Sequence, residues 1–370
     1  MSITTTDDVR IRGLRPLLPP AILLEELPMS PAEVEVVERG RHGVRAALSG
    51  ESERLVVVVG PCSLHDPDAG LEYAHRLAAA AAAHRAQLHV VMRVYFEKPR
   101  TIVGWKGLIN DPRRDGSFAI NDGLRVARSF LREVVRLGLP AGTEFLDPIS
   151  PQFIADLISW GAIGARTTES QVHRELASGL SMPIGFKNGT GGTVQIAVDA
   201  IRSAAHPHRF LSVTKQGLAA IVETEGNPHG HAILRGGSSG PNYGPEPFAA
   251  AVTRHQRAGL TPHIMIDCSH ANSGKDHLRQ VSVVEEVAEM VARDSPRHVL
   301  GVMLESFLVA GRQELARGEL VYGQSVTDAC MAWEQTELAL EALAAATKRR
   351  RALPRARAHA ATHGKDRVSA

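Results

Sequence analysis

The sequence predicts an α/β fold built as a (β/α)8 TIM barrel, and two observations lead to this prediction. Short apolar segments recur eight times between residues 55 and 304, and alanine- and leucine-rich segments with helical spacing separate most of them. Eight such units in roughly 250 residues agree with a closed barrel in number and length. A doubly wound open sheet stays an alternative, because strand number alone does not show closure. The expected strands are residues 55–59, 88–94, 140–143, 162–165, 183–186, 210–213, 264–266 and 299–304.

Residues 1–54 precede the first expected strand and are interpreted as an N-terminal arm and helix. Ser30 provides an N-cap, Pro31 occupies the first helical position, and Glu33 lies three residues after the cap. This arrangement is typical of a helix that begins with a capping box. Gly50 marks the expected end of the helix.

One segment does not fit the eightfold repeat. Residues 219–235 contain two short apolar runs on either side of a turn rich in Gly, Pro and Asn. This pattern predicts a β-hairpin inserted after the sixth strand. A last helix at 334–347 completes the expected catalytic barrel, which spans residues 55–347.

The charge of the chain is unevenly distributed. The formal net charge of +2 combines +7 in residues 348–370 with −5 in the rest of the chain. We expect residues 348–370 to form a basic, disordered tail. The near-neutral total argues against a protein that neutralises nucleic-acid phosphates over its whole surface, and the tail has no aromatic side chains to stack on bases. No nucleic-acid partner is therefore expected.

The cysteines and the apolar runs predict the compartment. Cys62, Cys268 and Cys330 are odd in number and far apart, so they do not form a disulfide framework. No signal peptide is visible, and no apolar run reaches the ~20 residues that a membrane span needs. We expect a cytoplasmic protein with no membrane partner.

Polar side chains follow the ends of the expected strands. The active site of a (β/α)8 barrel is assembled at the carboxyl ends of its strands, from residues of several strands. These side chains are therefore expected to meet at one mouth. They are Cys62, Arg93, Glu144, Arg166, Lys187, Lys215, His270 and Glu305.

Cations form one candidate group near this mouth. Arginine binds carboxylate and phosphate through two parallel hydrogen bonds, and lysine offers a compact positive charge. Such a group in an acidic body favours a pocket for a small phosphorylated and carboxylated molecule. Each of these residues taken alone is also compatible with solvated surface charge. The group comprises Arg93, Lys98, Arg166, Lys187 and Arg235.

A second candidate group combines Cys62, His270, Glu305 and Asp328. One thiolate, one imidazole and two carboxylates suit a divalent transition metal that acts as a Lewis acid, better than they suit a closed structural zinc site. Their spacing matches no short metal motif. A packed cysteine and a hydrogen-bonded core histidine therefore remain alternatives.

Longer motifs show a family resemblance. The segments GPCSLHDP at 60–67, MRVYFEKPRTIVGWKGLINDP at 92–112, LRGG at 234–237 and IDCSHANSGKDH at 266–277 resemble type I 3-deoxy-D-arabino-heptulosonate 7-phosphate (DAHP) synthase. The resemblance covers about residues 7–347 and points to the microbial branch that aromatic amino acids regulate. It implies a (β/α)8 barrel enzyme at the first step of the shikimate pathway.

The resemblance also implies a reaction and a set of site residues. Phosphoenolpyruvate, erythrose 4-phosphate and water would give DAHP and phosphate, with one divalent metal ion (Mn, Fe, Co or Zn) in each subunit. Lys98, Arg93, Lys187 and His270 would be catalytic, with Lys98 as the proton donor. The implied metal ligands are Cys62, His270, Glu305 and Asp328. The implied phosphoenolpyruvate residues are Arg93, Lys98, Glu144, Ala165, Arg166, Lys187 and Arg235, and those for erythrose 4-phosphate are Lys98, Pro99, Arg100 and Thr101.

Feedback regulation is a further implication, with homodimers or homotetramers as the expected assemblies. In the regulated branch, the N-terminal arm and the inserted hairpin frame an effector pocket, and Ser181 resembles the phenylalanine-sensitive members more than the tyrosine-sensitive ones. A plain subunit interface is the alternative for these positions. They are Asp7, Asp8, Pro151, Gln152, Leu176, Leu180, Ser181, Phe210, Ser212 and Val222.

Three other functions remain open. A related synthase joins phosphoenolpyruvate to arabinose 5-phosphate, but it carries a different stretch where this chain has Lys98 to Thr101. An amino-sugar synthase of secondary metabolism would keep most of the same residues. A catalytically silent barrel that binds a partner is the third, and the intact cation and metal groups argue against it.

Overall fold

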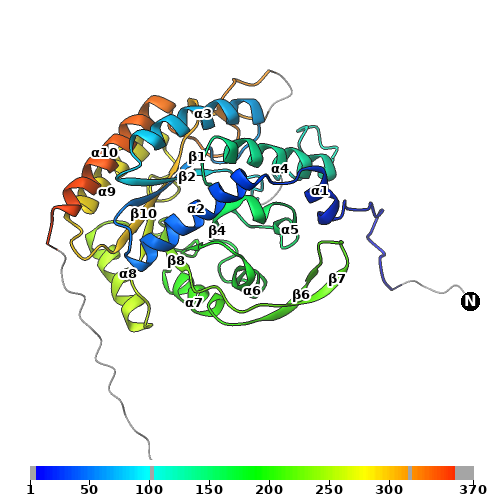
Figure 1. Cartoon of the computed structure of the whole chain (residues 1–370), viewed down its shortest axis with the longest axis horizontal. Helices are drawn as coiled ribbons and strands as arrows, with labels where there is room; N and C mark the ends of the chain where they lie inside the picture. The colour runs from blue at the N-terminus through cyan, green and yellow to red at the C-terminus, as the bar shows by residue number, and fades with distance from the viewer. Residues whose placement is uncertain (1–5, 101–103, 316–318, 355–370) are drawn as a thin grey trace, which may run out of the picture.

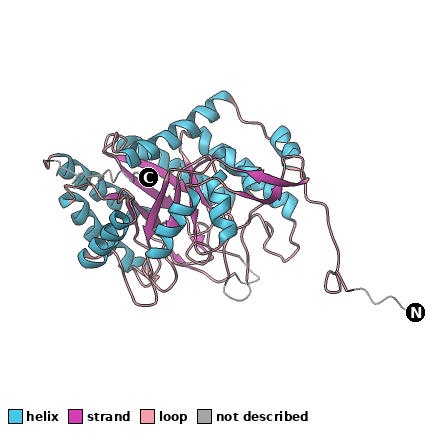
Figure 2. Cartoon of the chain, turned by 90° about the horizontal axis from the view of Figure 1, so that it is seen from below, coloured by secondary structure: helices cyan, strands magenta, loops and turns pink. Residues whose placement is uncertain are grey.

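The computed structural model describes residues 6–100, 104–315 and 319–354. Eight parallel strands close into a barrel that helices surround (Figure 1, Figure 2). The predicted (β/α)8 barrel with an inserted hairpin is therefore confirmed. Around the barrel the strand order is β1-β10-β9-β8-β5-β4-β3-β2. The strands are β1 (Leu55–Gly60), β2 (Leu88–Arg93), β3 (Ala141–Glu144), β4 (Ile158–Ile163), β5 (Ile184–Lys187), β8 (Gly230–Leu234), β9 (Ile264–Asp267) and β10 (Val299–Glu305).

The barrel strands are covered on both faces, which explains their continuous apolar sequences. All six residues of β1, which reads LVVVVG, are buried. Helices cover the outside of a parallel barrel and side chains fill its inside, so its strands need no polar face. Val56, Val91, Trp160 and Met265 belong to the inner core.

Helices between the strands form the outer ring. In α4, for example, Leu124, Phe130 and Leu131 are buried on one face, as the helical periodicity predicts. The helices are α3 (Pro67–Ala83), α4 (Ile120–Arg136), α5 (Pro151–Ile154), the 3-10 helix η1 (Ala155–Leu157), α6 (Gln171–Gly179), α7 (Gln195–Ala204), α8 (Pro245–Arg257), α9 (His277–Arg293) and α10 (Trp333–Arg351). None of the described helices is long and apolar enough to cross a membrane.

Two helices precede the barrel, α1 (Pro20–Glu26) and α2 (Pro31–Ser49). The predicted capping box is present in α2: Ser30 Oγ accepts a hydrogen bond from Glu33 N, and the Glu33 carboxylate accepts one from Ser30 N. Two glycines let α2 approach the strands closely. A Cβ on Gly40 would lie 2.4 Å from Ser159 Oγ, and one on Gly43 would lie 2.2 Å from His89 Cε1. Helix α2 therefore packs directly against the ends of the barrel strands.

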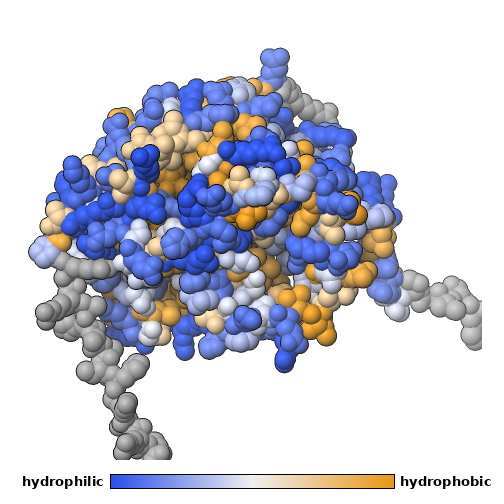
Figure 3. All heavy atoms as spheres, in the orientation of Figure 1, coloured by the Kyte–Doolittle hydropathy of each residue, from blue (hydrophilic) through white to orange (hydrophobic). Residues whose placement is uncertain are grey.

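The residues of the hairpin differ from the expected ones. Strand β6 (Arg209–Val213) pairs antiparallel with β7 (Ala219–Glu223), outside the barrel. The hairpin therefore does not span 219–235, and β8 is the sixth strand of the barrel in place of 210–213. Leu211 and Ile221 are paired partners that face solvent, 87% and 71% exposed. Figure 3 shows hydrophobic side chains at the surface where Figure 1 places this hairpin.

The carboxyl-terminal helix is longer than expected. We expected a helix at 334–347 and a disordered tail from 348, but α10 continues to Arg351. The physical reason is the burial of Arg350, whose guanidinium donates hydrogen bonds to Val299 O and Glu53 O. The rest of the expected tail, residues 355–370, lies outside the described residues. Strands β11 (Val309–Arg312) and β12 (Gln324–Ser325) form a small separate sheet.

Candidate active site

A cavity of about 690 Å³ opens at the carboxyl ends of the barrel strands. Its wall contains seven lysines and arginines, so it is an anion-attracting pocket inside a mildly acidic protein body. These cations are Lys98, Arg100, Arg166, Lys187, Arg235, Lys275 and Arg312. The other lining residues that the sequence predicted are Pro99, Glu144, Ala165, His270 and Asp328.

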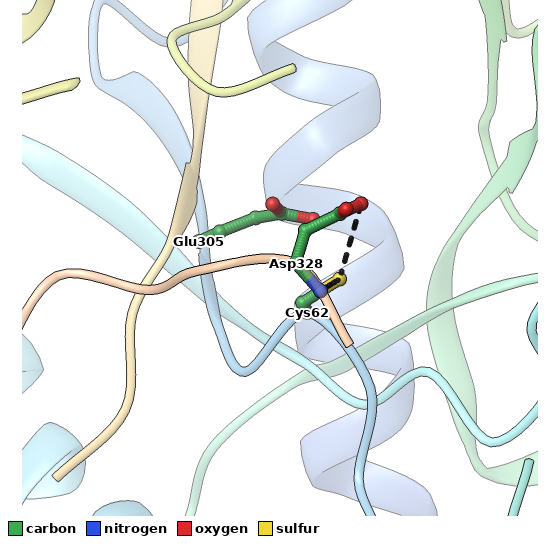
Figure 4. Close-up of side chains that lie close together, drawn as sticks. All are labelled: Cys62, Glu305 and Asp328. Carbon is green, nitrogen blue, oxygen red and sulfur yellow. Dashed lines mark hydrogen bonds between the residues drawn. The ribbon is translucent and has the colours of Figure 1, made fainter. Parts of the chain in front are cut away.

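Three of the four predicted metal ligands meet next to this cavity; Asp328 lines it, whereas Cys62 and Glu305 do not. Cys62 follows β1, Glu305 ends β10, and Asp328 lies in the loop after β12 (Figure 4). One sulfur and two carboxylate oxygens of these residues lie within 4.8 Å of one another. This soft thiolate with hard carboxylates fits a divalent transition metal. Burial, and then the nearby Glu305 carboxylate, raise the pKa of the Cys62 thiol overall, although Lys98 acts to lower it.

His270 lies beside this cluster, oriented by Asp267. Its Nδ1 lies 2.8 Å from Asp267 Oδ2, and its Nε2 lies 3.8 Å from Glu305 Oε1. Ser269 Oγ also lies 2.7 Å from Nδ1, so two polar neighbours on this ring nitrogen orient the imidazole and leave Nε2 available to a metal. Burial lowers the pKa of His270, which favours the neutral form that metals require. Three of the predicted ligands therefore form one cluster, and His270 approaches it through Glu305.

Arg93 lies beneath the cavity and is fully buried. Its guanidinium donates to Pro61 O, Cys62 O and Glu305 Oε1, and it stacks 3.6 Å from the centre of the Tyr95 ring. Arg93 is not among the residues that line the cavity. In this geometry it holds two of the predicted metal ligands in place.

Lys98 joins the ligand cluster to the cation-lined wall. Its Nζ donates to Cys62 Sγ at 2.8 Å and lies 3.7 Å from Asp328 Oδ2. Burial lowers the pKa of this ammonium, but the surrounding Cys62 and carboxylates outweigh burial and raise it overall. Arg100 follows two residues later and donates to Trp105 O. Thr101, predicted for the same stretch, lies outside the described residues.

The remaining predicted substrate residues surround the cavity from three strands. Lys187 at the end of β5 is buried, and its Nζ lies 3.4 Å from Asp267 Oδ2. The backbone N–H of Arg235, after β8, donates to Asn188 Oδ1. Arg166 follows β4, and its guanidinium donates to Pro99 O at 3.4 Å. The structure therefore brings cations from separate strands to one wall.

Lys215 is a correction to the sequence prediction. It was expected at the mouth because it follows residues 210–213, but that segment belongs to the hairpin. Its Nζ donates to Gln152 O, at the edge of a different cavity. Arg235, at the end of the true sixth strand, occupies the position expected for Lys215.

This second cavity measures about 440 Å³ and lies between α2, α5, α6 and the hairpin. Eight of the ten predicted effector residues line it: Pro151, Gln152, Leu176, Leu180, Ser181, Phe210, Ser212 and Val222. The other two, Asp7 and Asp8, lie in the exposed amino-terminal arm and do not line it. Arg41, Lys215, Glu38 and Asp156 add charges of both signs to an apolar wall. Such a wall suits a small zwitterion with an apolar side chain.

Several contributors to the active-site cavity were missed from the sequence. Asp267 ends β9 and pairs with both His270 and Lys187, but one residue cannot be recognised as a positioning group without its partners. Lys275 lies in the loop between β9 and α9, and Arg312 ends β11, a strand outside the barrel, so the rule about barrel strand ends finds neither. Their only sequence signal is a positive charge close to recognised motifs.

Comparisons with known proteins agree on one family. The model of the DAHP synthetase I family matches residues 30–341. The chain is similar to "Phospho-2-dehydro-3-deoxyheptonate aldolase, Phe-sensitive" of Escherichia coli (strain K12), with 55% identity over 93% of this chain and 98% of the relative. It is also similar to a tyrosine-inhibited aldolase of the same name from Schizosaccharomyces pombe, with 52% identity over 93% of this chain and 94% of the relative.

A solved structure gives the same result in three dimensions. The phospho-2-dehydro-3-deoxyheptonate aldolase of Francisella tularensis SCHU S4 superimposes with a TM-score of 0.90 and 50% identity. The match covers 92% of this chain and 99% of that chain. The similarity of fold therefore extends over most of this chain.

Proposed function

This chain belongs to the DAHP synthetase I family, and from that membership we propose that it condenses phosphoenolpyruvate with erythrose 4-phosphate and water to give DAHP and phosphate. The observation that carries the proposal is the cation-lined cavity above a cysteine, histidine and carboxylate cluster. Two anionic substrates need such a wall, because their mutual repulsion must be neutralised before they can react.

The two substrates are assigned to the predicted residues. Arg166, Lys187 and Arg235 would bind the phosphate and carboxylate of phosphoenolpyruvate, with Glu144 and Ala165 beside them. Pro99, Arg100 and Thr101 would bind erythrose 4-phosphate, and Lys98 would lie between the two. Arg93, which the resemblance implies for phosphoenolpyruvate, does not line the cavity; because its guanidinium donates to Cys62 O and Glu305 Oε1, it would instead support this site from below.

A divalent metal ion is part of the proposal. Cys62, His270, Glu305 and Asp328 would hold it. Donor atoms of Cys62, Glu305 and Asp328 lie within 4.8 Å of one another, and His270 Nε2 lies 3.8 Å from Glu305 Oε1, which supports this assignment. When bound, the ion would polarise the aldehyde of the sugar phosphate. Mn, Fe, Co and Zn all suit this mixed set of ligands.

The side chains supply the remaining chemistry. C3 of phosphoenolpyruvate forms a bond to the aldehyde carbon, and Lys98 is placed to give a proton to the aldehyde oxygen as charge develops on it. Water adds at C2, and the resulting phosphohemiketal releases phosphate when its carbon–oxygen bond breaks. Arg166, Lys187 and Arg235 remain fixed by the strand ends and stabilise the negative charge throughout.

The test is an assay of phosphate release with matched substrates. The purified enzyme should release phosphate from phosphoenolpyruvate with erythrose 4-phosphate, and much less with arabinose 5-phosphate or an imino-sugar analogue. A chelator should abolish the activity, and an added divalent metal should restore it. Lys187→Ala and Cys62→Ala should each be inactive. Near-normal turnover of either variant, or full activity after chelation, would overturn the assignment.

Feedback inhibition by an aromatic amino acid is proposed for the second cavity. Leu176, Leu180 and Phe210 would contact the aromatic ring, and Ser181 favours phenylalanine over tyrosine. Asp7 and Asp8 are the other two effector residues that the resemblance implies, and they do not line the cavity in this chain. Initial rates measured against phenylalanine, tyrosine and tryptophan test this, and no inhibition by any of the three would remove the proposal.

A homodimer or homotetramer in the cytoplasm completes the proposal. The exposed Leu211 and Ile221 of the hairpin and the exposed Leu14 of the arm supply apolar surface of the kind that subunits bury. The three cysteines are free and buried, which suits a reducing compartment. Light scattering on the purified protein should give at least twice the 39.8 kDa chain mass.

A further inference from the structure

Lys275 contacts one of the proposed metal ligands from the solvent side. Its Nζ donates to Asp328 Oδ1 at 3.1 Å. The other carboxylate oxygen, Oδ2, lies 3.8 Å from Cys62 Sγ. The two oxygens of this carboxylate therefore face different partners: Lys275 on one side, and on the other the thiol together with Lys98 Nζ, which lies 3.7 Å from Oδ2.

The backbone of Lys275 is tied to a second proposed ligand. Its N–H donates to His270 O at 2.6 Å. Both residues have left-handed backbones, with φ of +63° for Lys275 and +54° for His270. This conformation is costly for residues other than glycine and persists only where the surroundings impose it. The turn thus presents the lysine side chain toward Asp328 and the imidazole toward Glu305.

Lys275 is consequently a bridge between two loops that are distant in sequence. His270 and Lys275 lie between β9 and α9, whereas Asp328 lies between β12 and α10. Glu305 ends β10, and Cys62 and His270 follow β1 and β9 within three residues, whereas Asp328 adjoins no barrel strand and its side chain is 25% exposed. A carboxylate in such a loop needs a second contact to keep one orientation.

We propose that Lys275 is a positioning residue, which holds Asp328 Oδ1 so that Oδ2 faces Cys62 and the divalent metal site is preformed. This inference rests on the proposed metal site and adds to it the group that orients its most exposed ligand. The alternatives are a purely electrostatic effect of the ammonium and a direct contact with substrate, since Lys275 also lines the cavity.

These three hypotheses predict different changes in metal affinity when Lys275 is substituted. A positive charge close to a cation site repels the cation, so removal of an electrostatic lysine should strengthen metal binding. Removal of a positioning lysine should weaken it, by about tenfold. Removal of a substrate contact should raise KM and leave metal affinity unchanged.

The experiment titrates Mn²⁺ into chelator-treated enzyme and measures free Mn²⁺ by electron paramagnetic resonance. The variants are Lys275→Met, which removes the charge and the hydrogen bond, and Lys275→Arg, which keeps both. Lys348→Met, an exposed lysine on α10, is the matched control. We expect about tenfold weaker Mn²⁺ binding in Lys275→Met, and affinities within about threefold of the parent enzyme in the other two. Thermal unfolding in chelator should be unchanged, because the side chain is 56% exposed.

Each outcome supports or overturns the proposal. Equal or tighter Mn²⁺ binding in Lys275→Met overturns it, as does a raised KM for either substrate at unchanged Mn²⁺ affinity. An Arg variant as weak as the Met variant also overturns it, because Arg keeps the hydrogen bond and charge. Absence of Mn²⁺ binding in the parent enzyme is a different failure, since it removes the proposed metal site itself.

Discussion

Asp267→Asn should weaken both metal binding and folding. The parent carboxylate is fully buried and carries a negative charge between Lys187 Nζ at 3.4 Å and His270 Nδ1 at 2.8 Å. Although burial raises the pKa of Asp267, His270 and Lys187 hold it well below its usual value. Asparagine keeps the size of the side chain and removes this charge.

Two consequences follow from the geometry. Lys187 would keep a buried ammonium without its counter-charge, which costs about 3 kcal/mol. For a chain of 370 residues this lowers the Tm by about 4 °C. An amide N–H facing His270 Nδ1 would also favour the tautomer with the proton on Nε2, the nitrogen that must be free for a metal. Mn²⁺ affinity should fall by about 10- to 100-fold.

Calorimetry and Mn²⁺ titration measure the two effects separately. Asp115→Asn, in an exposed loop, is the control and should change neither quantity. A variant at position 267 that binds Mn²⁺ as tightly as the parent enzyme and melts at the same temperature would refute the role given to Asp267.

Three other predictions concern regulation, packing and pH. Ser181→Trp should fill the second cavity and abolish inhibition by phenylalanine, while kcat stays within about twofold of the parent value. If the variant is inhibited by the same phenylalanine concentration as the parent enzyme, the proposed role of this cavity is contradicted. Gly43→Val should place a side chain against His89 and lower the free energy of unfolding, measured in urea, by about 1–3 kcal/mol. A variant as stable as the parent would show that α2 can move away from the barrel. Burial lowers the pKa of His89 to about 4 and of His231 to about 3. Below pH 6.5 these histidines bind protons in the unfolded chain but not yet in the folded protein. The free energy of unfolding should therefore fall between pH 6.5 and 4, by up to about 1.4 kcal/mol per pH unit for each histidine. Equal urea midpoints at pH 7 and 5 would contradict this prediction.

The barrel was predictable because its strands are unlike the rest of the chain. A run such as LVVVVG has no polar face, and only a strand covered on both sides tolerates it. Strand β4 was placed four residues too late, because Ser159 and Gly161 interrupt its apolar pattern. Boundaries shift where small or polar residues are buried, and composition does not reveal that burial.

The hairpin strands were assigned incorrectly because the local sequence of a strand does not show which strand it pairs with. Strands β6 and β8 are both short and apolar, but Leu211 in β6 faces solvent, whereas Ile233 in β8 lies in the barrel core. An exposed leucine looks like a buried one in the sequence. The position of Lys215 was therefore wrong for the same reason.

The distribution of charged residues in the sequence predicted the cation-lined cavity correctly, but it predicted the start of the carboxyl-terminal tail less well. Cations after barrel strands were expected at the mouth, since the topology brings these strand ends together. The basic run at 348–351 was interpreted as solvated, but Arg350 is buried against carbonyl oxygens. A count of charged residues cannot show that backbone carbonyl groups elsewhere in the fold will accept hydrogen bonds from one of them.

The hairpin is attached to the barrel without taking part in its closure. Strands β6 and β7 pair only with each other among the described strands, and the chain returns to the barrel at β8. Substitutions on the hairpin therefore leave the barrel's hydrogen-bonded ring intact while they reshape the wall of the second cavity. If the second cavity binds the effector as proposed, its selectivity can change through hairpin substitutions while the strands that carry the active-site residues keep their pairing.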